Sequence, residues 1–260
     1  MEKVTPESQQ AESREKPMRI VSQAVIIDFD RTMVDSDKCI ERLFAIAETF
    51  NNDKQVIDVQ KIKAEMKKVE DTGGSFNPLK YVEAALTIDQ MKDFKDKFIN
   101  AEGDPVAYAD VTPFIQMLDD NAIPYAVLTH GVSKEWQELK IKASGYNGPY
   151  KIIEHREKAK EIANLQSSEA RYRFSSLYEN SPQGTHENII ANTICLIDDK
   201  AVAFNGLPPS CIGYLLVRGE KRQKSQQGKI PWNTVPIRSL ENLEAVNHRI
   251  QFKQNMSLAA

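Results

Sequence analysis

The sequence has little cysteine and no long hydrophobic run, and both shortages exclude classes of protein. Its three cysteines, Cys39, Cys195 and Cys211, form neither a CxxC metal motif nor the even set of a disulfide framework. Reduced thiols are therefore expected. No apolar run approaches the roughly twenty residues that a membrane helix needs, and the first residues lack the apolar stretch of a signal peptide. We expect a cytoplasmic protein without membrane contact.

An excess of positive charge is also missing. Lys and Arg number 34 against 37 Asp and Glu, which gives a formal net charge of -3. Such a chain lacks the overall positive field that attracts nucleic acid or anionic lipid, so no nucleic-acid partner is expected. Hydrophobic residues make up 41% and charged residues 27%, which is ordinary for a globular protein. A chain of this length can bury a sizeable apolar core.

Polarity changes along the chain and divides it into a tail, a helical segment and an α/β core. Residues 1–18 have the polar composition of a disordered tail. Residues 20–29 form an apolar, β-branched run that predicts the first core strand. Apolar side chains in residues 37–104 follow helical spacing without a convincing strand. Residues 166–192 are polar and predict an insertion or a mobile loop.

Strands and helices alternate in the remainder of the chain. Apolar runs predict strands at residues 124–128, 193–197 and 212–217 and a short extended piece at 152–153, and helical spacing predicts helices from residue 112, at 133–143 and at 158–165. Such alternation predicts a Rossmann-like, doubly wound parallel sheet. The α/β core would then combine residues 19–36 with 105–250, interrupted by the helical residues 37–104.

The sharpest local feature is the pair of carboxylates Asp28 and Asp30, directly after the first apolar strand. Side chains two positions apart on a strand project to one side, and ligands of parallel sheets bind beyond the carboxyl ends of strands. Buried carboxylates cost free energy unless a cation or hydrogen bonds compensate, so a divalent metal is a natural partner. The alternative is a capped turn into a helix, with Asp30 or Thr32 as the cap.

A hydroxyl residue, Thr129, ends a second predicted strand and is followed by His130 and Gly131. A hydroxyl with adjacent backbone N–H groups ahead of a helix can hold a phosphate. His130 is then a candidate substrate contact, with a structural or solvated histidine as the alternative. Taken alone, an ordinary strand end is the commoner meaning of such a sequence.

Adjacent carboxylates, Asp198 and Asp199, end a third predicted strand. Neighbouring residues of an extended chain point apart, so we expect one carboxylate to meet a metal while the other braces the site, and we favour Asp199 as the direct ligand. A solvated turn would explain this pair alone. Three strands that each end in acid or hydroxyl residues together predict one ligand site.

In these motifs the chain resembles the haloacid dehalogenase superfamily. The signature of that superfamily is an apolar strand followed by DxDx(T/V), then a strand-end Ser or Thr, a Lys, and a final acidic pair. Asp28, Asp30, Thr129 and Asp198-Asp199 match it in order and rough spacing, over residues 20–240. The resemblance implies an α/β core with a helical cap, here residues 37–104, that selects the substrate.

The same resemblance implies the roles of these residues. Asp28 would be a nucleophile that forms an aspartyl-phosphate, and Asp30 would serve as general acid and then general base. Mg²⁺ would be held by Asp28, Asp30 through its backbone carbonyl, Asp198 and Asp199.

The superfamily also carries a catalytic lysine upstream of the acidic pair. Lys151, Lys158 and Lys160 are the candidates here. Lys158 begins a predicted helix, as the lysine of the family does, so we assign it to the substrate phosphate together with Thr129 and His130. A solvated charge on the helix face explains Lys160 better.

The expected function is Mg²⁺-dependent hydrolysis of a small-molecule phosphate monoester. Haloalkanoate dehalogenases of the superfamily generally lack an acid two residues after the nucleophile, so Asp30 favours phosphoryl chemistry. A phosphomutase of the same fold and a catalytically silent binding or regulatory protein are the alternatives. Arg31 departs from the family, because many members have Gly or Asn at this position.

Overall fold

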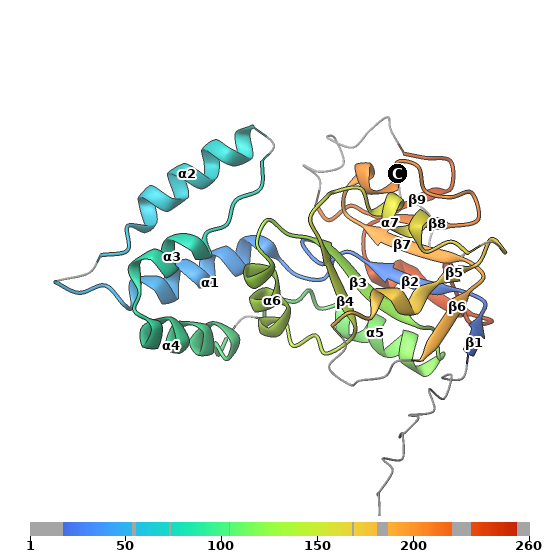
Figure 1. The fold of residues 1–260 in the computed structure, drawn as a ribbon, viewed down its shortest axis with the longest axis horizontal. Coiled ribbons are helices and arrows are strands. Elements are labelled where there is room, and N and C mark those ends of the chain that lie inside the picture. Colours follow the sequence, from blue (N-terminus) through green and yellow to red (C-terminus); the bar gives the residue numbers. More distant parts are fainter. Residues whose placement is uncertain are drawn as a thin grey trace, which may run out of the picture.

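The computed structural model describes residues 18–53, 56–72, 74–103, 105–167, 169–180, 187–219 and 230–253. Most of the predicted tail, residues 1–17, therefore lies outside the described residues. A sheet-based core and a group of helices beside it make up the described part (Figure 1). No helix in these ranges is long and apolar enough to cross a membrane.

The core is built on a six-stranded sheet of order β4-β3-β2-β7-β8-β9, in which all neighbouring strands are parallel. Its strands are β2 (Ala24–Ile27), β3 (Tyr125–His130), β4 (Tyr150–Ile153), β7 (Ile194–Asp198), β8 (Ile212–Leu216) and β9 (Thr234–Ile237). The chain moves outward from β2 to β4 on one side and from β7 to β9 on the other. The predicted Rossmann-like, doubly wound fold is confirmed.

Both faces of this sheet are covered. Val25 and Ile27 of β2 belong to one apolar cluster, and Ala24 and Ile26 belong to a second. This alternation is what a strand buried on both faces requires. The helices around the sheet are α5 (Val111–Asp120), α6 (Lys134–Ala143), α7 (Lys158–Asn164), η1 (Phe174–Leu177), η2 (Ala201–Phe204) and η3 (Leu240–Asn242).

Four helices stand to one side of the sheet, next to α6 (Figure 1). They are α1 (Ser36–Glu48), α2 (Val59–Asp71), α3 (Leu79–Ala85) and α4 (Ile88–Ile99). The side chain of Asp35 caps α1, and a capping box of Thr87 and Gln90 opens α4. Phe98 of α4 packs against Trp136 of α6 with ring centroids 5.5 Å apart. The helical group is thus joined to the core by an apolar contact.

The predicted first strand, residues 20–29, is two strands in different sheets. β1 (Met18–Val21) pairs in parallel with β6 (Asn188–Ala191), and β6 pairs in antiparallel with β5 (Tyr172–Arg173). The prediction of one strand is wrong because Gln23 interrupts the apolar run. Gln23 is buried, and its side-chain oxygen accepts a hydrogen bond of 2.7 Å from the backbone N–H of Ile250.

The predicted loop of residues 166–192 contains regular structure. Its described part includes β5, η1 and β6, while residues 168 and 181–186 lie outside the described ranges. Tyr172, Phe174 and Leu177 are fully buried there. The expectation of a loop is wrong for the described residues, because a few large apolar side chains anchor an otherwise polar stretch. An antiparallel hairpin, β10 (Leu243–Val246) and β11 (Arg249–Phe252), completes the fold.

Candidate active site

The three predicted motifs meet at the carboxyl ends of neighbouring strands. Asp28 follows β2, Thr129 lies near the end of β3, and Asp198 ends β7. Because β2 lies between β3 and β7 and the chain reverses its direction of travel there, this is the topological switch point of the sheet. Parallel α/β sheets bind their ligands at such a point.

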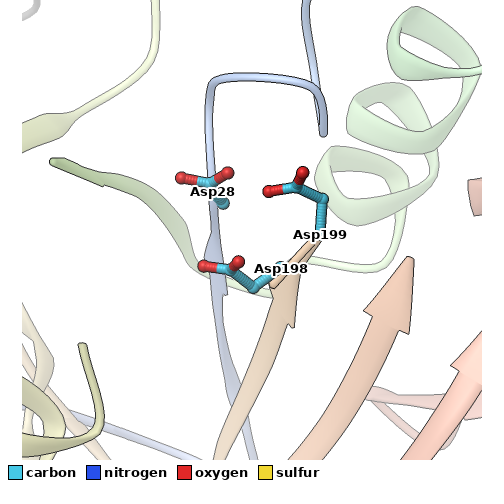
Figure 2. Close-up of side chains that lie close together, drawn as sticks. All are labelled: Asp28, Asp198 and Asp199. Carbon is cyan, nitrogen blue, oxygen red and sulfur yellow. The ribbon is translucent and has the colours of Figure 1, made fainter. Parts of the chain in front are cut away.

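Three buried carboxylates converge at this point. Oxygens of Asp28, Asp198 and Asp199 all lie within 4.8 Å of one another, and the carboxylates gather beyond the ends of β2 and β7 (Figure 2). Asp198 and Asp199 both belong to the group, although adjacent residues of a regular strand would point apart. Carboxylate oxygens at this spacing suit Mg²⁺.

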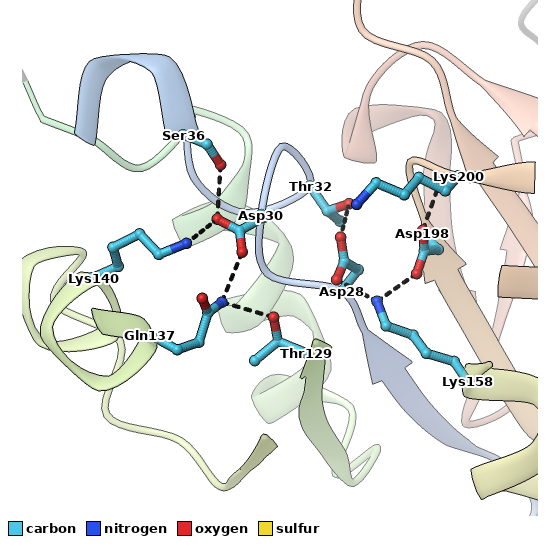
Figure 3. Close-up of polar contacts among 10 residues, drawn as sticks. All are labelled: Asp28, Asp30, Thr32, Ser36, Thr129, Gln137, Lys140, Lys158, Asp198 and Lys200. Atoms are coloured by element: carbon cyan, nitrogen blue, oxygen red, sulfur yellow. Dashed lines mark hydrogen bonds and ion pairs between the residues drawn. The ribbon is translucent and has the colours of Figure 1, made fainter. Parts of the chain in front are cut away.

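Lys158 lies among these carboxylates. Its ammonium contacts Oδ1 of Asp28 and donates a hydrogen bond of 2.5 Å to Oδ2 of Asp198 (Figure 3). The other two candidate lysines lie elsewhere: Lys151 pairs with Glu161 and Glu179, and exposed Lys160 pairs with Glu157. Of the three lysines that the sequence leaves open, only Lys158 reaches the acidic group.

The charges of this group are compatible with a bound divalent cation. Burial disfavours the Lys158 ammonium, but Asp198 and Asp28 outweigh burial and raise its pKa above the ordinary value. Burial, together with the charge of Asp28, raises the pKa of Asp198 to about 6 in spite of Lys158. Three buried carboxylates share one buried ammonium, so the donor atoms and their charge fit Mg²⁺.

Asp30 is directed away from this group, toward α6 (Figure 3). Its carboxylate accepts hydrogen bonds of 2.8 Å from Ser36 and from Gln137, and it forms an ion pair with Lys140. Burial alone would raise the pKa of Asp30, but Lys140, Gln137 and Ser36 lower it to about 2. Asp30 is therefore a carboxylate at neutral pH, and its side chain lies apart from the three clustered carboxylates. The metal ligand predicted at Asp30 is its backbone carbonyl.

Thr129 is fully buried and is linked to Asp30 through Gln137. The Gln137 amide donates to Oγ1 of Thr129 at 2.7 Å and to Asp30 at 2.8 Å. Gly131 permits this approach of α6, since a Cβ at that position would lie 3.3 Å from Cβ of Gln137. Gln137 was not predicted as a site residue, because the sequence does not say which face of its helix meets the sheet.

A small cavity opens above Asp28. Its volume is about 30 Å³ and it is lined by Asp28, Asp30, His130, Arg156, Lys158, Asp198, Lys200, Val202 and Ala203. A cavity needs roughly 10–15 Å³ for each water, so this space holds about two waters. Of the two residues predicted to contact a phosphate from the second strand, His130 lines the cavity and Thr129 lies outside its lining.

Comparison with known proteins finds the same fold among solved structures. No protein-family model matches the chain, and no curated protein matches it in sequence. A solved haloacid dehalogenase-like hydrolase from Burkholderia xenovorans LB400 matches its fold with a TM-score of 0.53 and 16% identity, over 85% of this chain and 94% of that one. This chain has the haloacid dehalogenase-like fold. The resemblance stated from the motifs is thus confirmed at the level of the fold.

Further solved structures match over similar lengths. A haloacid dehalogenase-like family hydrolase from Xanthomonas campestris is 12% identical with a TM-score of 0.41, over 85% of this chain and 92% of that one. A structure named as a β-phosphoglucomutase, from Thermotoga maritima, is 12% identical with a TM-score of 0.42, over 85% of this chain and 95% of that one.

In this haloacid dehalogenase-like fold, a buried network braces the turn that carries Asp28. Arg218 donates to the backbone carbonyl of Thr32 at 3.0 Å and to both carboxylate oxygens of Asp110 at 2.8 and 2.9 Å. Asp110 also accepts from Ser239 and from the backbone N–H of Leu240. The sequence carries no motif that marks these residues, because they come from segments far apart along the chain.

Proposed function

We propose that this protein is a Mg²⁺-dependent phosphatase that hydrolyses small-molecule phosphate monoesters through Asp28. The observation that carries this proposal is the group of Asp28, Asp198, Asp199 and Lys158, buried together at the switch point of the sheet. The fold supports it, and so does the second acid, Asp30, two residues after Asp28. The three buried cysteines are free thiols, which suits the cytoplasm that we propose as its location.

The chain's own residues divide the proposed reaction between them. An oxygen of Asp28 attacks phosphorus in line, the bond from phosphorus to the leaving oxygen breaks, and an aspartyl-phosphate forms that water then hydrolyses. Lys158 balances charge on the phosphoryl oxygens, and Thr129 and His130 are proposed phosphate contacts. Asp28, Asp198 and Asp199, with the backbone carbonyl of Asp30, would hold Mg²⁺, which would supply further positive charge at those oxygens.

Asp30 must move to take part. In the proposed reaction it gives a proton to the leaving oxygen and then takes one from the attacking water. A carboxylate whose pKa is about 2 under the influence of Lys140 is a poor proton donor at neutral pH. The proposal therefore requires Asp30 to leave Lys140 and Gln137 and turn toward the leaving group. Hydrogen bonds of catalytic groups commonly reach their productive geometry only when substrate is bound.

The helices of residues 37–104 are proposed as the cap. Arg156, at the cavity, donates a hydrogen bond of 2.8 Å to Ser75 in the segment between α2 and α3. The helical group thus touches the mouth of the cavity directly. Because this contact lies at the entrance for a substrate, we propose that the helical group moves relative to the core when substrate enters.

The test is phosphate release from p-nitrophenyl phosphate and a panel of metabolite phosphates, with and without Mg²⁺. Release should depend on Mg²⁺, and Asp28→Asn should reduce kcat by about 10³-fold or more, because the nucleophile is lost. Asp37→Asn, an exposed carboxylate in the same segment, is the matched control and should retain activity. Full activity of a folded Asp28→Asn variant would overturn the proposal.

A catalytically silent ester-binding protein is the second candidate. The engagement of Asp30 by Lys140, Gln137 and Ser36 favours it, because a protein without turnover has no need of a mobile acid. Calorimetry distinguishes the two. Binding of Mg²⁺ and phosphate esters without release of phosphate would select the silent protein. Transfer of phosphate from one ester to another would select a phosphomutase.

A further inference from the structure

Among the residues that the structure describes, no acidic side chain pairs with two cations at the mouth of the cavity. Arg156 and Lys200 line the same cavity as Asp28 and Lys158. Within the described ranges, neither has an Asp or Glu side chain within 4.0 Å, whereas the buried Lys140 and Lys158 both pair with carboxylates. The positive charge of Arg156 and Lys200 is thus available to something that enters the cavity.

Arg156 lies where the helical group meets the core. It follows β4 in the segment that leads to α7, and the hydrogen bond of its guanidinium to Ser75 reaches the connection between α2 and α3. A leaving group bound to phosphorus at Asp28 would extend from the core toward these helices. Arg156 therefore lies on the leaving-group side of the cavity.

Lys200 approaches from the opposite strand. It follows Asp198 and Asp199 at the end of β7, and its backbone N–H donates to Asp198 at 2.8 Å. Its side chain extends back over Asp28 toward Thr32 (Figure 3). Lys200 therefore lies beside Asp28, where the reacting phosphate would bind, whereas Arg156 is the cavity cation with a described hydrogen bond to the helical group.

His130 shows that this part of the cavity is electropositive. Burial lowers the pKa of His130, and the charges of Arg156 and Lys200 lower it further. The imidazole is then neutral at pH 7 and does not compete with Arg156 for an anion. A guanidinium fork matches the two oxygens of a carboxylate or a phosphate.

We propose that Arg156 is a specificity-determining residue that binds a second anionic group, a carboxylate or a second phosphate, on the leaving-group side of the substrate. This inference rests on the proposed phosphatase function. A substrate with a neutral leaving group would leave the Arg156 guanidinium with Ser75 alone. The substrate class is therefore a phosphate monoester that carries a further negative charge.

Matched pairs of esters test this inference. Glycerol 3-phosphate and 3-phosphoglycerate differ in a carboxylate, and glucose 6-phosphate and glucose 1,6-bisphosphate differ in a phosphate. The wild-type enzyme should prefer the more anionic member of at least one pair by about tenfold or more in kcat/KM, as expected for a charged hydrogen bond. Which pair shows the preference tells the carboxylate from the phosphate.

Arg156→Met should abolish that preference while the fold is retained, because the side chain is exposed. On the more anionic ester, kcat/KM should fall by about 10- to 100-fold, mainly through a higher KM. The loss of kcat/KM on p-nitrophenyl phosphate, which carries no second anionic group, should be smaller than the loss on the more anionic ester. Lys160→Met, at an exposed cation on α7, is the matched control and should preserve the preference.

Other outcomes overturn the inference separately from the proposed function. An equal loss on all esters would assign Arg156 to the transferring phosphate, and an unchanged preference would exclude it as a determinant. If the wild-type protein releases phosphate from no ester, the proposed function fails. Calorimetric binding of the same pairs to wild-type and Arg156→Met proteins then decides the inference, since equal affinities of the wild type for both members would reject it.

Discussion

Arg31 holds the turn after Asp28 in a conformation that suits glycine. Its φ is +64°, a left-handed conformation that costs an L-residue with a Cβ about 1–2 kcal/mol. Backbone hydrogen bonds impose the turn, since Arg31 donates to Val34 at 2.8 Å and Met33 donates to Phe29 at 2.9 Å. The ion pair of Arg31 with Asp37, 3.5 Å long and solvent-exposed, offsets little of that cost.

At this position Arg31→Gly should raise the free energy of unfolding by about 0.5–1 kcal/mol, because relief of strain exceeds the added entropy of the unfolded chain. Arg31→Val should lower it by about 1 kcal/mol or more, since β-branching aggravates the strain. Urea denaturation at neutral pH measures both. Arg31→Ala controls for the lost charge, and a glycine variant less stable than the alanine variant would contradict the prediction.

At the scale of the element, α6 connects the helical group with Asp30. Trp136 of α6 packs against Phe98 of α4, and Gln137 and Lys140 of the same helix reach Asp30. The Lys140 ammonium also lies 5.5 Å from the centre of the Trp136 ring, a favourable cation–π arrangement. The same helix therefore contacts both the helical group and the acid of the proposed reaction.

The ion pair of Lys140 and Asp30 should show as a coupling in a double-mutant cycle. Lys140→Met and Asp30→Asn should each lower the free energy of unfolding, because each leaves a partly buried charge without its partner. The double variant should be more stable than the sum of the two losses predicts, by about 1–3 kcal/mol. Chemical denaturation of the four proteins measures this, and additivity within about 0.5 kcal/mol would show that the pair is not coupled.

At the scale of the whole molecule, Asp110 and Arg218 join segments that are distant in sequence. Asp110 precedes α5, Arg218 follows β8, and Ser239 and Leu240 begin η3, so one buried carboxylate ties three parts of the core to the turn at Thr32. Burial would raise the pKa of Asp110, but Arg218, Ser239 and Leu240 lower it below the ordinary value. The network favours the ionised form.

This shift predicts a dependence of stability on pH. Because the pKa of Asp110 in the folded state lies below the unfolded value near 3.9, its ionised form stabilises the fold at neutral pH. That contribution declines as the pH falls below about 4 and through the folded-state pKa. Asp110→Asn should lower the free energy of unfolding at pH 7 on the order of 3 kcal/mol.

Urea denaturation between pH 7 and pH 3 tests the assignment. The difference between wild-type and Asp110→Asn proteins should narrow toward pH 3, since Asp110 of the unfolded wild-type chain takes up a proton in this range. Asp119→Asn, at a carboxylate on α5 that accepts a long hydrogen bond of 3.4 Å from Tyr125, is the control and should have a small effect. A constant difference across this range would contradict the proposed role of the Asp110 charge.

Much of the core follows from local patterns. β7 is predicted because its continuous apolar run has no polar interruption, and it is buried on both faces. The run from residue 20 to 29 fails as a single strand because Gln23 finds a buried backbone partner 227 positions away. Residues 169–180 fail as a loop because their few large apolar side chains find the second apolar cluster of the core. Both errors arise from long-range contacts.

By itself the sequence predicted that Asp28 and Asp198 would meet, because parallel strands of an alternating α/β chain end at one edge of the sheet. The resemblance to the superfamily selected Lys158 from three candidate lysines, and the structure brings it to both carboxylates. Only the tertiary structure decided that Asp30 faces Gln137 and Lys140, and that Arg156 reaches Ser75. Strand order depends on local patterns and connection rules. The face that a helix turns toward a distant loop depends on packing of the whole chain, which no local pattern encodes.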